Sequence, residues 1–135
     1  MAAENNLWQT LRPALKEAGF FVQRIENTTG AGVPDVWVAN GARYAWLELK
    51  AQRAYPARAT TPVFGRDGLR TEQENWLTAA HRAGVVAYVV AGVGVGALRT
   101  LYAVPATRAL EFNRMDRTAL AQYAVTVPQL LLRLA

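Results

Sequence analysis

Two carboxylates and a lysine are the residues of this sequence best suited to chemistry. Asp35 ends the tetrapeptide Gly32-Val33-Pro34-Asp35, and Glu48 and Lys50 are separated by one residue in Glu48-Leu49-Lys50. A pair of carboxylates can hold a hard divalent cation that polarises a phosphoryl oxygen, and a lysine can orient the attacking water or neutralise developing charge. These residues therefore predict metal-assisted phosphodiester hydrolysis, provided that they converge.

A predicted β-hairpin brings them together. Residues 33–39 and 44–51 are typical of strands, and Asn40-Gly41 between them is a strong two-residue turn signal. A two-residue loop places Asp35 opposite Trp46, and a four-residue loop places it opposite Glu48. In both registers the two carboxylates and Lys50 share one face, because side chains alternate along a strand. Only an odd-length loop or a bulge would separate them.

A plainer interpretation is that these charges form the solvated face of a half-exposed hairpin, held by a cross-strand ion pair. Two predicted helices favour a site instead. In the first, residues 4–18, Glu4 falls within the apolar stripe, which comprises Leu7, Trp8, Leu11 and Leu15. A carboxylate on that stripe is a candidate third acidic ligand, although a first-turn glutamate is also favoured by the helix dipole.

The second helix is expected from residue 71 to about residue 82, with Thr71 as N-cap and Glu74 completing a capping box. Gln73 lies in line with Trp76 and Leu77 on the packing face. It could therefore reach the carboxylates or the lysine, or it could bond to nearby backbone.

The segment 52–70 shows no periodicity and is predicted to be a long basic loop. Arginines within it are suited to DNA phosphates, and aromatic residues between them are suited to base stacking. The candidate DNA-binding residues are Arg53, Arg58, Arg66, Arg70 and Tyr55, with Phe64 as a further aromatic. An arginine-rich surface loop without a ligand is the alternative.

Composition narrows the function classes. The formal charge is +5, the pI is about 10.1, and thirteen of the fifteen basic residues are arginine, which favours a nucleic-acid partner. Without cysteine, and with His81 as the single histidine, a metal site must use oxygen ligands, and Mg²⁺ or Mn²⁺ is expected. No leader pattern or apolar run of about 20 residues is evident, so a cytoplasmic location, in a bacterial cell or a phage-infected host, is expected.

The predicted fold class is α/β. Helix, three strands, helix and strand follow in the order α-β-β-β-α-β, with a further strand at 99–104. The 135 residues are expected to form a single domain with a core at about 4–104 and a short helical C-terminal extension at about 105–135. The extension is predicted to hold short helices near 107–112 and 117–123 and a last one opened by Pro128.

Gly32-Val33-Pro34-Asp35, the hairpin, Glu48-Leu49-Lys50-Ala51 and a helix led by Gln73 resemble the PD-(D/E)xK nuclease superfamily. Within it, the sequence is most similar to the virus-type replication-repair nuclease (VRR-NUC) group. The resemblance covers about residues 4–90. It implies a restriction-endonuclease-like mixed sheet flanked by helices, and it assigns the site to Glu4, Asp35, Glu48, Lys50 and Gln73, with the Leu49 carbonyl as a further metal ligand.

The resemblance also implies an Mg²⁺- or Mn²⁺-dependent endonuclease that acts on DNA, structure-selectively on branched forms such as four-way junctions. A homodimer is expected, because one domain needs a partner subunit to cut both strands symmetrically. Two alternatives remain open. One is a DNA-binding or assembly module that keeps the fold without turnover, and the other is an ordinary α/β protein in which the acidic cluster never forms.

Overall fold

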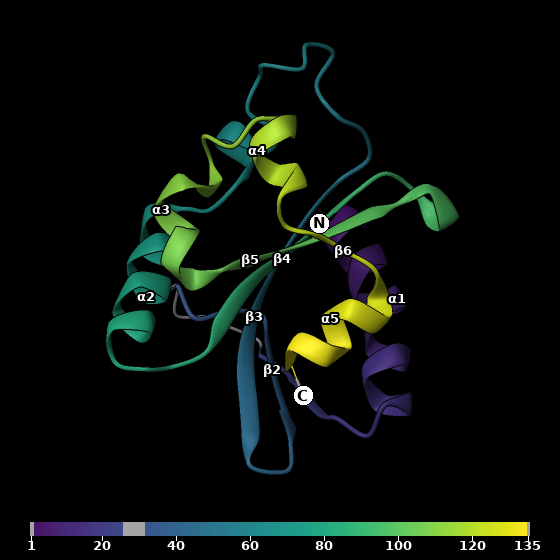
Figure 1. Ribbon diagram of the computed structural model, residues 1–135, viewed down its shortest axis with the longest axis vertical. Coiled ribbons are helices and arrows are strands. Elements are labelled where there is room, and N and C mark those ends of the chain that lie inside the picture. Colours follow the sequence, from purple (N-terminus) through teal and green to yellow (C-terminus); the bar gives the residue numbers. More distant parts are fainter. Residues whose placement is uncertain (1, 26–31, 135) are drawn as a thin grey trace.

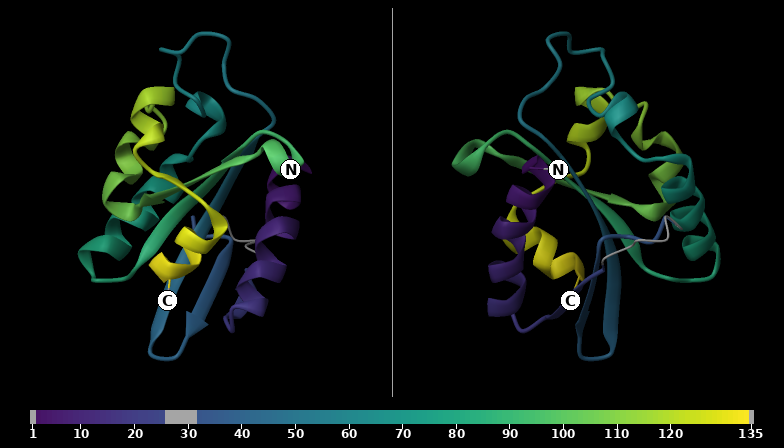
Figure 2. Two further views of the ribbon diagram at one scale, coloured as in Figure 1. Left: turned by 45° about the vertical axis from the view of Figure 1, so that its right-hand side comes forward. Right: turned by 180° about the vertical axis from the view of Figure 1, so that it is seen from behind.

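A computed structural model describes residues 2–25 and 32–134 and shows one mixed sheet between two layers of helices (Figures 1 and 2). Six strands lie in the order β1-β2-β3-β4-β5-β6. They are β1 (Phe21–Arg24), β2 (Val36–Asn40), β3 (Arg43–Gln52), β4 (Ala87–Val93), β5 (Thr100–Pro105) and β6 (Ala124–Val125). The helices are α1 (Ala2–Glu17), α2 (Thr71–Arg82), α3 (Ala109–Phe112), α4 (Arg117–Ala121) and α5 (Val127–Leu134).

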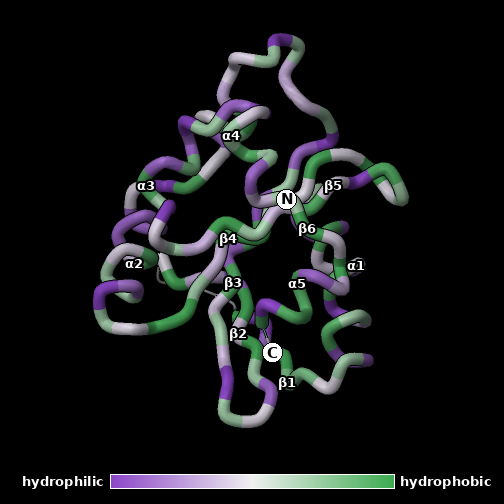
Figure 3. The backbone as a smooth tube through the Cα atoms, in the orientation of Figure 1, coloured by the Kyte–Doolittle hydropathy of each residue, from purple (hydrophilic) through white to green (hydrophobic). Residues whose placement is uncertain are grey.

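The strand directions follow from the connections. β1, β2 and β3 pair antiparallel, as do β4, β5 and β6, whereas β3 and β4 are parallel. A parallel pair needs a crossover, which the long loop and α2 supply. The central strand β4 consists only of apolar residues, tyrosine and glycine, and runs through the interior (Figure 3). The predicted α/β class and mixed sheet are confirmed.

Each face of the sheet has its own core. Helices α1 and α5 cover one face, where Leu7, Leu47 and Leu130 are buried together. Helices α2, α3 and α4 cover the other, where Leu77 and Phe112 pack on Val89 of β4. The elements that position a site at the end of β3 are therefore held from both sides.

The turn of the β2–β3 hairpin differs from the prediction by one residue. Asn40 pairs with Arg43, so the turn residues are Gly41 and Ala42, and Gly41 supplies the positive φ of 65°. The expected pairing of Ala39 with Ala42 is wrong. The last printed pair, Val36 with Leu47, brings Asp35 beside Glu48, as a four-residue loop predicts. The shared face survives because the shift is an even number of residues.

The expected N-cap of α2 is also wrong. Arg70 is the N-cap residue, Thr71 is already helical, and the residue that reaches back to the cap is Gln73 rather than Glu74. A capping residue can act through its backbone alone, so local preference for threonine did not decide the helix start.

The C-terminal segment contributes to both cores. Its three helices lie close to the predicted positions, and Pro128 falls in the first turn of α5. Strand β6 was not anticipated, and it adds to the sheet beside β5. Leu130 and Leu134 are buried against α1, so these residues complete the fold rather than extend it. In the parts of the chain that the structure describes, no helix is long and apolar enough to span a membrane.

Candidate functional site

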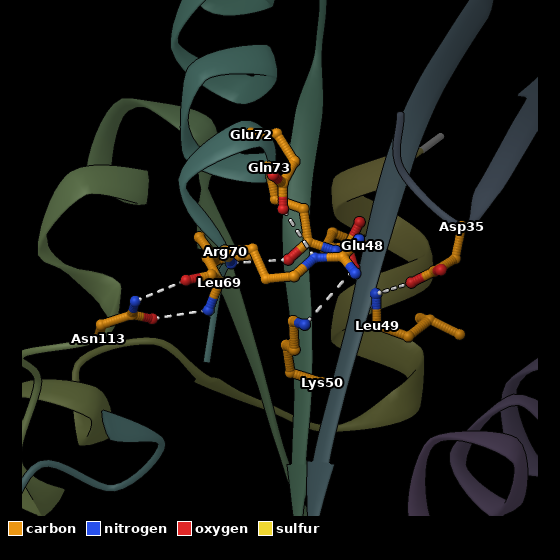
Figure 4. A network of polar contacts seen from close by, with 9 residues as sticks. All are labelled: Asp35, Glu48, Leu49, Lys50, Leu69, Arg70, Glu72, Gln73 and Asn113. Atoms are coloured by element: carbon orange, nitrogen blue, oxygen red, sulfur yellow. Dashed lines mark hydrogen bonds and ion pairs between the residues drawn. The ribbon is translucent and has the colours of Figure 1, made fainter. Parts of the chain in front are cut away.

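The hairpin brings the predicted carboxylates and lysine to one place. Asp35 immediately precedes β2, and its Oδ2 accepts a hydrogen bond from the backbone N–H of Leu49 at 2.8 Å (Figure 4). On β3, the Nζ atom of Lys50 lies 3.9 Å from Oε2 of Glu48. The backbone of the strand that carries Glu48 and Lys50 thus fixes the Asp35 carboxylate beside them.

Burial rules out the solvated-face interpretation. The exposed fraction is 2% for Glu48 and 7% for Lys50. Burying charged groups is costly, and mutual attraction at 3.9 Å is a weak return for removing both from water. An arrangement that opposes stability in this way is typical of a functional site.

Gln73 holds the Glu48 carboxylate in position. Its Oε1 accepts the backbone N–H of Arg70 at 2.9 Å, and its Nε2 donates to Oε2 of Glu48 at 3.1 Å. The backbone donor fixes the orientation of the amide, so the NH₂ group must face the carboxylate. The predicted inward direction of Gln73 is therefore confirmed, and both suggested partners, carboxylate and backbone, are engaged at once.

Glu48 is in an environment that lacks positive charge. Burial, followed by the neighbouring Asp35 carboxylate, raises the pKa of Glu48 to about 9, although Lys50 acts in the opposite direction. Its Oε1 atom is buried without a hydrogen-bond partner. A divalent cation would supply both the missing partner and the missing charge, and carboxylate oxygens are the ligands that Mg²⁺ and Mn²⁺ prefer. The residues present therefore fit such an ion.

The raised pKa predicts how stability depends on pH in the absence of divalent cations. The folded chain keeps a proton on Glu48 that the unfolded chain releases above a pKa of about 4.5. The associated stability is complete below that value and is lost as the pH rises through about 9. We expect the melting temperature of wild type in EDTA to fall over this range and Glu48→Gln to melt about 5 °C higher at the alkaline end.

Calorimetry across this pH range tests the expectation. Glu17→Gln, which changes an exposed glutamate of α1, serves as the control. Parallel melting curves for wild type and Glu48→Gln would contradict it.

A cavity of about 570 Å³ opens over these groups. The predicted residues Glu4, Asp35, Glu48, Lys50 and Gln73 all contribute to its wall, together with Asp67, Gly68 and Arg70, among others. Glu4 lies at the first turn of α1 and is half-buried, and desolvation raises its pKa while Lys50 opposes the shift. In the described residues, no three His, Cys, Asp or Glu side chains form a group that could hold a metal. A role for Glu4 and for the Leu49 carbonyl as ligands thus stays a prediction.

Gly32 sets the distance between the Asp35 segment and α2. It has a φ of 77°, and a Cβ atom at this position would lie 2.2 Å from the Glu72 carbonyl oxygen. No other residue type fits so close to backbone. The glycine therefore brings the chain before Asp35 against the start of the helix that carries Gln73.

Asn113 is a site-supporting residue that sequence reasoning missed. From the segment after α3, its Oδ1 accepts the backbone N–H of Leu69 at 2.7 Å and its Nδ2 donates to the Leu69 carbonyl at 2.8 Å (Figure 4). Leu69 is followed by Arg70, whose N–H binds Gln73. A clamp on this peptide thus leads through Gln73 to Glu48, and no local sequence signal points to it.

We expect Asn113→Ala to lower the rate of any reaction at this site about tenfold, because small displacements of positioning groups are costly. Single-turnover measurements well below the melting temperature would test this, with binding measured in parallel. Asn75→Ala, which removes an exposed asparagine of α2, is the matched control. An unchanged rate would show that the clamp is only structural.

The long loop is ordered around its apolar residues. Phe64 is buried and stacks on Phe112 at a centroid distance of 5.0 Å, so its expected availability to bases is wrong. Tyr55 is half-buried, with the Arg117 guanidinium 3.9 Å from its ring centroid and its hydroxyl hydrogen-bonded to Tyr102. The ring anchors the loop, and its contact with DNA stays a prediction.

The four candidate arginines of the loop are exposed. Arg53, Arg58 and Arg66 project from loop residues, whereas Arg70 borders the cavity and pairs with Glu72 at 3.0 Å. Their binding of DNA is not established by this geometry, but their side chains are accessible to a polyanion.

Comparisons with known proteins relate this architecture to a nuclease. No protein-family model and no curated protein match the chain. Among solved structures, it is similar to Hjc, a Holliday junction resolvase from the archaeal hyperthermophile Archaeoglobus fulgidus, with 18% identity, a TM-score of 0.63 and coverage of 98% of both chains. The chain therefore has the fold of that resolvase over nearly its whole length.

Proposed function

We propose that this protein is a divalent-cation-dependent endonuclease that hydrolyses DNA phosphodiester bonds and selects branched DNA. The observation that carries the proposal is the burial of Glu48 beside Asp35 and Lys50, with one carboxylate oxygen left unpartnered. The fold shared with a Holliday junction resolvase supports the substrate class. The order of motifs along the chain supports membership of the PD-(D/E)xK nucleases and their VRR-NUC group.

The residues divide the work as follows. Asp35 and Glu48 would hold Mg²⁺ or Mn²⁺, with the Leu49 carbonyl and Glu4 as further oxygen donors. When bound, the ion would supply Lewis acidity toward the phosphate and the attacking water. Lys50 orients the nucleophile and neutralises charge that develops on the phosphoryl oxygens. Gln73 keeps the Glu48 carboxylate turned toward the cavity.

The loop arginines would contact the DNA backbone. Arg53, Arg58, Arg66 and Arg70 are exposed on the segment that directly follows the β3 strand, and a net charge of +5 favours a polyanionic partner. Backbone contacts position a substrate without reading bases. Selection of branched DNA would therefore depend on shape and on the spacing of two active centres in a homodimer.

The test is cleavage of four-way junctions, flaps, nicked duplexes, linear duplexes and single strands, with Mg²⁺, with Mn²⁺ and with EDTA. We expect cation-dependent cuts, with junctions preferred. A complete lack of cleavage with either ion, together with tight binding of junctions, would instead establish the second candidate, an inactive DNA-binding or assembly module. The preserved bond from Gln73 to Glu48 argues against that module, because binding alone does not need it.

A further inference from the structure

An aromatic surface continues from the active centre along the same side of the sheet. It comprises Phe21 of β1, Trp37 of β2, Tyr44 and Trp46 of β3, and Trp76 of α2. The strand register places the first four on the face that also carries Asp35 and Glu48. We call these five residues the aromatic surface.

The rings form a connected set. Phe21 meets Trp37 edge-on at a centroid distance of 5.6 Å, and Trp37 lies 6.4 Å from Tyr44. Trp37 is the direct cross-strand partner of Trp46, which in turn contacts Trp76 at 5.4 Å. Such contacts hold each ring in a defined position, so the surface is a preformed platform.

Much of this platform faces solvent. Phe21 is 58% exposed and Tyr44 is 47% exposed, and the other three rings are partly exposed. The opposite face of the same strands is buried, with Val38 and Ala45 packed against the α1 and α5 side. The hairpin projects beyond the helices at the bottom of Figure 1. Contiguous exposed aromatic residues of this kind mark an interaction surface.

Charge identifies the kind of partner. Beyond Asp35 and Glu48, the described parts of β1, β2 and β3 place Phe21, Gln23, Trp37, Ala39, Tyr44 and Trp46 on this face, and none of them is charged. Thirteen arginines are present elsewhere in the chain, yet no strand residue of this face is basic, as phosphate contacts would require. Uncharged aromatic patches are instead characteristic of the centres of protein interfaces.

We infer that the aromatic surface binds a second copy of this chain. Two copies with a formal charge of +5 each repel, so they can associate most readily through a face that lacks charge. β1, which carries Phe21, is the edge strand of the sheet, and its free edge lies next to the surface. The inference rests on the proposed function for its purpose, two cuts by two centres, and on the aromatic surface for its location.

Ala39 offers a sharp test. It lies between Phe21 and Tyr44 in the strand register and is only partly buried, so Ala39→Arg adds a charge at the centre of the surface without removing a core contact. We expect wild type to be a dimer in sedimentation equilibrium and Ala39→Arg to raise the dimer dissociation constant about 30-fold or more. Trp37→Ser is a second variant, and Leu98→Arg, at a residue 88% exposed between β4 and β5, is the control.

Each outcome decides the inference. A monomeric wild type, or a dimer that survives both Ala39→Arg and Trp37→Ser, overturns it. If the surface binds DNA instead, Ala39→Arg leaves association unchanged and strengthens the binding of single-stranded DNA, which also overturns it. Association is measured without substrate or cation, so a failed nuclease assay would leave this result unaffected.

Discussion

Asp35→Asn is expected to lower the rate of DNA cleavage about 1000-fold while leaving DNA affinity nearly unchanged. The asparagine side chain has nearly the same shape, and its oxygen can still accept the Leu49 N–H, so the hairpin keeps its geometry. What is lost is one of the two negative charges that would hold the cation beside Glu48. The measurement is single-turnover cleavage of a four-way junction at saturating Mg²⁺, with binding assayed in Ca²⁺.

The matched control is Asp67→Asn. Asp67 borders the same cavity and is exposed, so its replacement removes an equal charge from the same wall without touching the carboxylate pair. Its rate should stay within about threefold of wild type. Equal rates for Asp35→Asn and wild type would refute the catalytic assignment, and equal losses in both variants would reduce it to a general effect of cavity charge.

Lys50→Met is expected to lower the cleavage rate about 100-fold or more. Methionine fills a similar volume and removes only the ammonium group, which lies 3.9 Å from the Glu48 carboxylate and is almost completely buried. Loss of this positive charge should also stabilise the protonated form of Glu48 further, since Lys50 opposes the rise in its pKa. Single-turnover rates across a pH series would show both effects.

The only other lysine of the chain provides the control. Lys16 lies in the last turn of α1 and is exposed, so Lys16→Met changes the net charge equally. Lys50→Arg is informative as well, because a planar guanidinium keeps the charge but does not reproduce the position of the ammonium group. Full activity in Lys50→Met would remove this residue from the mechanism.

Alternation along the strands made the core of the site predictable. The turn was assigned one residue too early, yet Asp35, Glu48 and Lys50 still share a face, because both registers differ by an even number of residues. Helical periodicity likewise indicated that Gln73 points inward. Regular secondary structure thus transmits side-chain direction over a distance that local sequence covers.

Contacts between distant segments were not predictable in this way. Asn113 clamps Leu69 from 44 residues away, and β6 joins the sheet only because β5 offers it an edge. The N-cap of α2 moved from Thr71 to Arg70, since Gln73 satisfies the Arg70 N–H and Glu48 together. In each case the partner that decides the structure is remote in sequence.

The sequence by itself determined the strands and helices of the core and the face to which each candidate side chain points, since both depend on local periodicity. The tertiary structure alone decided that Glu48 is buried with an unpartnered oxygen and that its pKa rises to about 9. Desolvation depends on all the atoms that surround a group, and these come from every part of the chain. The same packing left the aromatic rings of Phe21 and Tyr44 exposed, which no periodicity could indicate.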